Sequence, residues 1–411
     1  MILAALLWLA LARQTETIAA IQVHGNTATS DEEVRRLAGV AVGMPFAAET
    51  VGDVVARLQA SKKFQHVDAL KRFASIVDPS QILLIIVVDE GAVRIVRTGD
   101  PNNPYRVERT HRRLNLMMMP VISHEDGYGL TYGVRLARPD VAGANSRLTF
   151  PLTWGGEKRV GVELEKAIPR GPIDRLTSSV SISRKTNPFF EADDDRTNVS
   201  VRGEREIVHG LRAGAMTEWQ RDTFLGASDT FAGAGGDVTV DTRIDPWLPR
   251  NAVYARAGWE HLAFDSRGGV NVTELDGRGY LGLIGQTVLA VRGLRRDADR
   301  PLPPALQPLL GGLANLRGFR AGTAAGDTLV ATSAELIVPL TSPVEIGKMG
   351  VSAFVDAGAA YAKGERFADQ TLKRGYGGSI WFSAAFLRLN IAVAHGRGAT
   401  TRVHVGGTLS F

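Results

Sequence analysis

The sequence predicts a small α+β domain followed by an antiparallel transmembrane β-barrel of sixteen strands. Helical spacing of apolar residues occurs only before about residue 112, and period-two alternation continues from there to residue 411. One face of each alternating segment is apolar and the other is small or polar, as in a barrel with a wet lumen. The chain begins with an apolar run that resembles an export signal, and it ends in Phe411. A soluble β-sandwich alternates as well, but so long a series of strands without a helix favours the membrane barrel.

Residues 1–14 are expected to form a signal peptide. Ile2–Ala12 is a continuous apolar run that ends in small residues. The run is too short to span a bilayer as a helix, and it matches the apolar core and cleavage site of a secretory signal. The usual basic region before the core is missing, and a buried helix is the alternative.

Composition excludes several classes of function. The formal net charge of +5 comes from Lys and Arg spread along the chain without a basic cluster, so nucleic acid is not an expected partner. The absence of cysteine removes disulfides, cysteine metal sites and thiol catalysis. No serine elbow, Walker loop or H-E-x-x-H motif is present. We therefore expect no enzymatic activity, no cofactor and no metal site.

Residues 17–97 are predicted to form a compact domain with the order β-α-α-β-β, and any small α+β domain is the alternative. Ser30 and Glu33 have the spacing of a helix capping box, and a second helix has apolar residues at helical spacing. Two helices on one face of a small sheet make a stable unit. The predicted elements are Ile18–His24, a helix after Ser30, Val51–Leu58, Phe64–Leu70 and Ile82–Val88.

Residues 98–111 are expected to be a linker, and residues 112–411 are assigned to the barrel. An even number of strands is what a bacterial single-chain barrel requires. The sixteen strands are placed at 114–122, 128–137, 146–154, 158–167, 175–184, 196–206, 210–221, 231–243, 252–264, 272–284, 286–297, 327–340, 348–361, 376–385, 386–396 and 402–411.

Connection lengths give the barrel an orientation. The long polar connections follow odd-numbered strands, and most even-to-odd connections are short. Long outer loops and short periplasmic turns are the known asymmetry of such barrels. The long connections are residues 185–195, 265–271, 298–326 and 362–375.

The longest connection, residues 298–326, contains Arg317 between an apolar residue and Gly318-Phe319. The planar fork of an arginine suits carboxylates, and a glycine beside it lets the backbone approach closely. The alternation of the next two strands places Glu335 and Asp356 on their lumenal faces. We therefore predict that the loop folds inward and that Arg317 bonds to Asp356 and secondarily to Glu335. The alternative is an exposed arginine on a surface loop.

Taken in order, these features resemble the BamA/TamA/FhaC superfamily of outer-membrane assembly and translocation barrels. The first domain resembles a POTRA (polypeptide-transport-associated) domain at Gly25-Asn26, at Phe64 with Val67, and at Val88-Asp89-Glu90-Gly91. The resemblance covers nearly the whole chain after the signal. In the barrel it rests on Leu316-Arg317-Gly318-Phe319, Glu335-Leu336-Ile337-Val338-Pro339, Phe354-Val355-Asp356-Ala357-Gly358, Asp241-Thr242-Arg243, and the terminal Gly406, Leu409 and Phe411.

The resemblance implies a lumenal lock of Arg317, Gly318 and Phe319 with Glu335 and Asp356, a turn motif at Asp241 and Arg243, and a C-terminal assembly signal. It also implies an outer-membrane protein with a periplasmic POTRA-like domain that inserts or translocates polypeptides. The implied partners are unfolded outer-membrane or secreted polypeptides, the lipid bilayer and periplasmic accessory proteins. The chain departs from the best-known members in having one POTRA-like domain, where assembly factors usually have several and two-partner-secretion transporters have two. A two-partner-secretion transporter and a passive pore or structural surface barrel remain alternatives.

Two polar clusters are expected to be solvated rather than functional. His124-Glu125-Asp126 falls in a predicted outer turn with no other metal ligand near it in the sequence. Asp193-Asp194-Asp195 falls in a predicted outer loop. We interpret both as surface turns.

Overall fold

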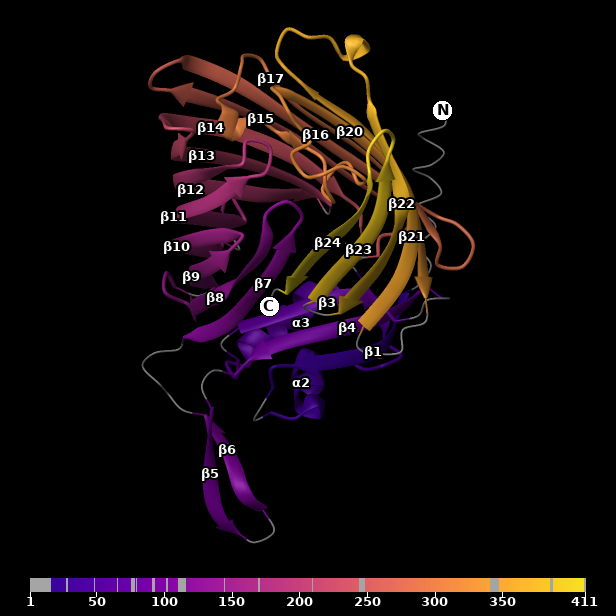
Figure 1. Ribbon diagram of the computed structural model, residues 1–411. Helices are drawn as coiled ribbons and strands as arrows, with labels where there is room; N and C mark the ends of the chain where they lie inside the picture. The colour runs from indigo at the N-terminus through magenta and orange to yellow at the C-terminus, as the bar shows by residue number, and fades with distance from the viewer. Residues whose placement is uncertain are drawn as a thin grey trace. The chain divides into compact units, whose positions relative to one another are not determined.

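The computed structural model describes most of the chain. The chain divides into two compact units, with the boundary between Leu116 and Met117. Figure 1 shows the elements of both units. No helix in the described ranges is long and apolar enough to cross a bilayer. The described residues are 16–26, 29–47, 49–64, 66–74, 78, 80–90, 93–100, 103–109, 116–143, 145–168, 171–208, 210–243, 248–340, 347–384 and 387–409. The expected signal peptide, residues 1–14, lies outside them.

The first unit is a four-stranded sheet of order β2-β1-β4-β3, with two helices, α2 and α3. Ser30 caps α2 by accepting a hydrogen bond from the Glu33 N–H, which is the predicted capping interaction. The helices and sheet share an apolar core that includes the fully buried Ile18, Val54 and Leu84. The bounds are β1 Glu16–His24, α2 Asp31–Ala38, β2 Pro45–Phe46, α3 Thr50–Ala60, β3 His66–Phe73 and β4 Gln81–Asp89. The predicted order lacked the two-residue β2 and the hairpin described next.

The expected linker was wrong in part, because residues 98–111 overlap a hairpin. Strand β5, Val93–Asp100, pairs with β6, Asn103–Arg109, in antiparallel register. The run Val93–Val96 is rich in β-branched residues, which favour strands. Pairing between the two halves satisfies backbone groups that a linker would leave to solvent.

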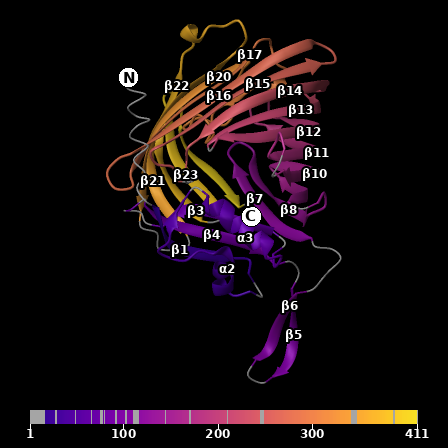
Figure 2. The same ribbon diagram turned by 180° about the vertical axis from the view of Figure 1, so that it is seen from behind.

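The second unit is a closed barrel of sixteen strands, as predicted, and consecutive barrel strands pair antiparallel around the ring (Figure 2). Among the described residues, the ring pairs each strand on both sides, and its shortest ladder joins β24 to β7 through three register pairs. The strands are β7 Met117–Glu125, β8 Gly129–Pro139, β9 Ser146–Gly155, β10 Glu157–Ala167, β11 Arg175–Asn187, β12 Ala192–Val208, β13 Leu211–Phe224, β14 Ala227–Asp241, β15 Ala252–Phe264, β16 Gly268–Gly282, β17 Val288–Ala298, β20 Thr328–Leu340, β21 Gly347–Tyr361, β22 Lys373–Ala384, β23 Leu387–Gly396 and β24 Thr401–Leu409.

Alternation along the strands separates a lipid face from a lumenal face. On β21, Val355 is 58% exposed whereas Asp356 is 4% exposed. The period of two places these neighbours on opposite sides of the barrel wall. The buried Ser352 and Phe354 share the lumenal face with Asp356, as the sequence predicted.

The connection between β17 and β20 folds into the lumen. It contains the 3-10 helix Pro304–Leu306 and the short strand pair β18 Leu309–Leu310 and β19 Ala324–Ala325. Leu310 and Leu316 are fully buried in a cluster that includes Leu329 of the barrel wall. This segment, residues 299–327, is called the inner loop below.

The folded barrel should be heat-modifiable. A closed hydrogen-bonded ring resists SDS until it is heated, so unheated protein should migrate faster on a gel than boiled protein. Protease added to intact cells should spare the barrel. Equal mobility of boiled and unheated samples, for a protein extracted from membranes, would argue against the closed barrel.

Candidate functional site

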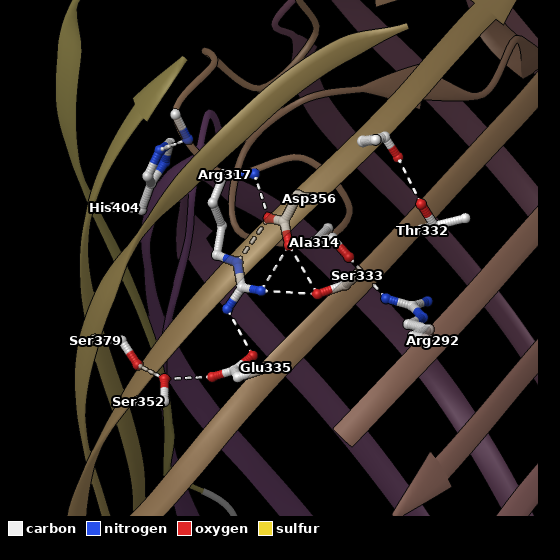
Figure 3. A network of polar contacts seen from close by, with 12 residues as sticks. Arg292, Ala314, Arg317, Thr332, Ser333, Glu335, Ser352, Asp356, Ser379 and His404 are labelled. Carbon is white, nitrogen blue, oxygen red and sulfur yellow. Dashed lines mark hydrogen bonds and ion pairs between the residues drawn. The ribbon is translucent and has the colours of Figure 1, made fainter. Parts of the chain in front are cut away.

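The centre of the candidate site is the ion pair between Arg317 of the inner loop and Asp356 of β21 (Figure 3). Nε and Nη2 of Arg317 donate to the two oxygens of Asp356, each at 2.8 Å. The backbone N–H of Arg317 donates to Oδ2 of the same carboxylate at 2.9 Å. This two-pronged geometry is the strong, oriented form of an arginine–carboxylate contact, and it is the contact that the strand phases predicted.

Neighbouring groups complete the surroundings of the guanidinium. Nη1 donates to Oε2 of Glu335 at 2.7 Å, and Nη2 also donates to Oγ of Ser333 at 2.9 Å. The Ser352 hydroxyl donates to the other oxygen of Glu335. The guanidinium carbon lies 3.4 Å from the ring centroid of Phe354, over its face, where a cation is attracted by the ring.

The pair can persist while buried because its hydrogen-bonding capacity is used. The side chains of Arg317 and Asp356 are 8% and 2% exposed. Burying a charge costs free energy unless it is paired and hydrogen-bonded, and here four of the five guanidinium N–H groups have acceptors. The arrangement holds the tip of the inner loop against the wall formed by β20 and β21.

Gly318 continues the contact on the other side of the loop tip. Its φ of +88° lies in the left-handed region, which favours glycine. A Cβ at this position would lie 2.7 Å from the backbone nitrogen of Gly396. Its N–H donates to Nε2 of His404 on β24 at 2.9 Å.

This hydrogen bond determines the tautomer of His404. Because Nε2 accepts from Gly318, the ring proton must be on Nδ1. Nδ1 therefore donates to Oδ2 of Asp126 at 2.6 Å. His404 is 1% exposed, and its two nitrogens join the inner loop to the turn between β7 and β8.

The interpretation of His124-Glu125-Asp126 as a solvated turn was wrong. Asp126 accepts from His404 and from the Leu313 N–H, the latter at 3.1 Å. Burial alone would raise the pKa of Asp126, but the hydrogen bonds from His404 and Leu313 hold that pKa below its usual value. His124 Nδ1 lies 2.8 Å from the carbonyl oxygen of Val405. The turn is part of the site because the strand before it neighbours the last strand of the chain.

Glycines on β22, β23 and β24 make room for the inner loop. A Cβ on Gly375 would lie 1.9 Å from the carbonyl oxygen of Arg317, and one on Gly396 would lie 2.6 Å from the carbonyl oxygen of Gly318. A Cβ on Gly406 would lie 2.3 Å from the side chain of Leu313. These strands therefore accept the loop backbone at a distance that other residues would prevent.

Two family models match the chain. The model described as the Omp85 superfamily domain matches residues 140–406, and the POTRA model, described as surface antigen variable number repeat, matches residues 16–91. The chain belongs to the Omp85 superfamily. It is an outer-membrane β-barrel protein whose POTRA domain lies in the periplasm.

Solved structures share the fold of this Omp85 protein. BamA from Haemophilus ducreyi lacking POTRA domains 1-3 aligns with a TM-score of 0.63 and 13% identity over 97% of this chain and 85% of that chain. CdiB from Escherichia coli aligns with a TM-score of 0.54 and 11% identity over 98% of this chain and 91% of that chain. At these identities the likeness concerns the fold alone. A comparison with curated proteins finds no match.

The turn motif of the Omp85 barrel lies apart from the inner loop. Nε and Nη2 of Arg243 donate to the two oxygens of Asp241 at 2.8 and 2.9 Å, and the guanidinium stacks on Tyr254 with 4.5 Å to the ring centroid. The pair fixes the exit of β14. Within the described chain, its ion pair is separate from the one between Arg317 and Asp356.

Of the three residues of the predicted C-terminal signal, the structure describes Gly406 and Leu409, which both belong to β24. Gly406 packs against Leu313 of the inner loop, and Leu409 pairs with Leu387 and Ile122 on either side. Phe411 lies outside the described residues, so its role as an assembly signal stays a prediction.

Deleting Phe411 should reduce the amount of barrel in the outer membrane to a small fraction of the wild-type level. The terminal apolar residue is expected to be read before the barrel closes. Phe411→Tyr, which keeps an aromatic ring, should assemble nearly normally. Immunoblots of outer-membrane fractions test this, and unchanged levels after deletion would show that the signal is misread.

Asp193-Asp194-Asp195 was also wrongly interpreted as a loop tip, because the three residues belong to β12. Asp194 is 6% exposed and pairs with Arg196 at 2.6 Å. Asp195 pairs with Arg184 on β11. The acidic run belongs to β12 because its residues find cross-strand partners on β11 and β13.

Sequence reasoning missed the roles of four residues that contact the inner loop: Asp126, His404, Gly375 and Gly396. A histidine alternating with Val403 and Val405 could have drawn attention as a polar group on the lumenal face of β24. Nothing in the sequence pairs it with Asp126, which is 278 residues away. The close approach at Gly375 depends on backbone atoms, which leave no sequence pattern.

Proposed function

We propose that this protein inserts or translocates unfolded outer-membrane or secreted polypeptides at the outer membrane, without enzymatic chemistry. The observation that carries the proposal is the inner loop, held inside the lumen by Arg317 on Asp356 and Glu335, in a barrel that follows a POTRA domain. The structure shows the loop docked, and breaking these contacts would give the barrel a second, released state. Membership of the Omp85 superfamily supports polypeptides as the substrate class.

The POTRA domain offers a place for substrate to bind. Strand β3, His66–Phe73, is at the end of the sheet order and pairs with β4 on one side. An unfolded segment can add to such an edge through backbone hydrogen bonds, which require no particular sequence. Periplasmic accessory proteins could use the same mode of binding. The free energy for insertion would come from folding of the substrate.

A passive pore is the second candidate, and the position of the inner loop argues against it. Leu310, Leu316 and Phe319 are buried within the barrel, where an open channel would need water. A cavity of about 710 Å³ remains beside the loop, lined by Arg159, Lys185 and Asp194 among others. Large steady conductance in planar bilayers would favour the pore.

Depletion in the native organism tests the proposed function. If the protein assembles or exports polypeptides, a defined set of outer-membrane or secreted proteins should fall in abundance while lipid content is unchanged. Loss of one large secreted protein encoded beside this gene would favour a two-partner-secretion transporter. An unchanged outer-membrane and secreted proteome would contradict both assembly and secretion.

A further inference from the structure

The closure of the barrel between β24 and β7 is incomplete at the backbone level. Within the described chain, backbone pairing at this seam joins Gly407, Thr408 and Leu409 to His124, Ser123 and Ile122. Strand β7 ends at Glu125, whereas β24 begins at Thr401. The outer part of β24 therefore extends past the end of its neighbour.

Side-chain contacts bridge the seam beyond the last backbone pair between β7 and β24. His124 Nδ1 meets the carbonyl oxygen of Val405, and Asp126 accepts the Nδ1–H of His404. Both contacts cross the seam, because His124 and Asp126 belong to the first hairpin and His404 belongs to the last strand. Asp126 and His404 also bind the inner loop, through the N–H groups of Leu313 and Gly318.

We propose that Asp126 and His404 couple docking of the inner loop to closure of the seam. With the seam closed, His404 is oriented by Asp126 and presents Nε2 to Gly318, while Asp126 presents Oδ2 to Leu313. If the seam separates, Asp126 moves away from His404, and the loop loses acceptors on one or both sides of its tip. Both residues are positioning residues, since each acts through the loop and the seam rather than on substrate.

The coupling is reciprocal by thermodynamic necessity. If a closed seam favours the docked loop by some factor, a docked loop favours the closed seam by the same factor. Arg317 on Asp356 then contributes to seam closure although neither residue belongs to β7 or β24. The biological role of the coupling rests on the proposed function. The coupling itself is a property of the barrel alone.

A disulfide across the seam tests the coupling in purified full-length protein. The chain has no cysteine, and Ser123 and Thr408 are register partners, so their Cα atoms are close enough for a disulfide. The readout is tryptic cleavage after Arg317, which is protected while the loop is docked. In Ser123→Cys/Thr408→Cys, oxidation should slow this cleavage about tenfold relative to the reduced protein.

Variants of His404 and Asp126 should reduce the ratio between the cleavage rates of the reduced and the oxidised protein. Asn at position 404 can keep a donor near Asp126 but cannot reach Gly318, so His404→Asn should lower the effect of oxidation to about twofold or threefold. Asp126→Ala removes the carboxylate that accepts from both His404 and Leu313, and it should bring the ratio close to one. The matched control is His395→Asn on β23, whose ring contacts Thr401, and it should keep the tenfold ratio.

The reverse measurement does not alter the coupling residues. Asp356→Asn weakens loop docking, and it should slow formation of the seam disulfide several-fold under mild oxidant. Heat-modifiable migration identifies variants that have folded. A ratio of one in the unaltered background, or an unchanged ratio in both His404→Asn and Asp126→Ala, would overturn the proposal. These assays use no substrate, so their outcome is separate from that of the depletion experiment.

Discussion

Replacing Asp356 by alanine is expected to release the inner loop while leaving the barrel folded. The change removes three hydrogen bonds to Arg317 and leaves its guanidinium buried with Glu335 as the remaining carboxylate partner. Removing one partner of a buried ion pair costs about 3–5 kcal/mol. Because the barrel ladder does not depend on this contact, the loss should appear as undocking. Protease protection of residues 299–327 and the level of transported or assembled substrates should both fall.

A matched control separates this effect from general loss of charge. Asp193 lies on β12, is about half exposed, and has no buried cation that depends on it. Asp193→Ala should therefore cost less than about 1 kcal/mol and leave loop protection unchanged. Removing Arg317 together with Asp356 should cost less than the sum of the two single changes, because the two residues contact each other directly. Wild-type loop protection in Asp356→Ala would contradict the lock.

Gly375→Ala should have the next largest effect, which arises from steric overlap rather than from loss of a charge. The added Cβ would lie 1.9 Å from the carbonyl oxygen of Arg317, and a backbone atom held by the ion pair beside it cannot turn aside as a flexible side chain could. Overpacking of this kind costs about 1–3 kcal/mol. We expect the loop to be displaced and protease cleavage within it to increase, with normal heat-modifiable migration.

The control for this substitution is a barrel glycine with room around it. A Cβ on Gly293 of β17 would meet no atom within 4 Å, so Gly293→Ala should leave loop protection and activity near wild type. If Gly375→Ala and Gly293→Ala behave alike, the close approach of the loop to β22 is not important for docking.

The barrel and its lumenal carboxylates were predictable because strands have a period of two. Once Val351 and Val355 are assigned to the lipid face, Asp356 must face the lumen whatever the details of packing. The same reasoning placed Glu335. Strand ends were less predictable: β12 begins at Ala192 rather than 196, because residues 192–195 find partners on β11 and β13.

The sequence by itself determined the order of most elements, the number of barrel strands, and the lumenal positions of Asp356 and Glu335. Each of these follows from local periodicity and from the pairing of strands that are consecutive or nearly so. Only the tertiary structure decided the short register between β24 and β7, and hence that His404 meets Asp126. Barrel closure brings together two ends of the chain, and hydrogen bonds between residues so far apart leave no periodic pattern. The space that Gly375, Gly396 and Gly406 provide was likewise decided by the path of the inner loop, which depends on all the strands around it.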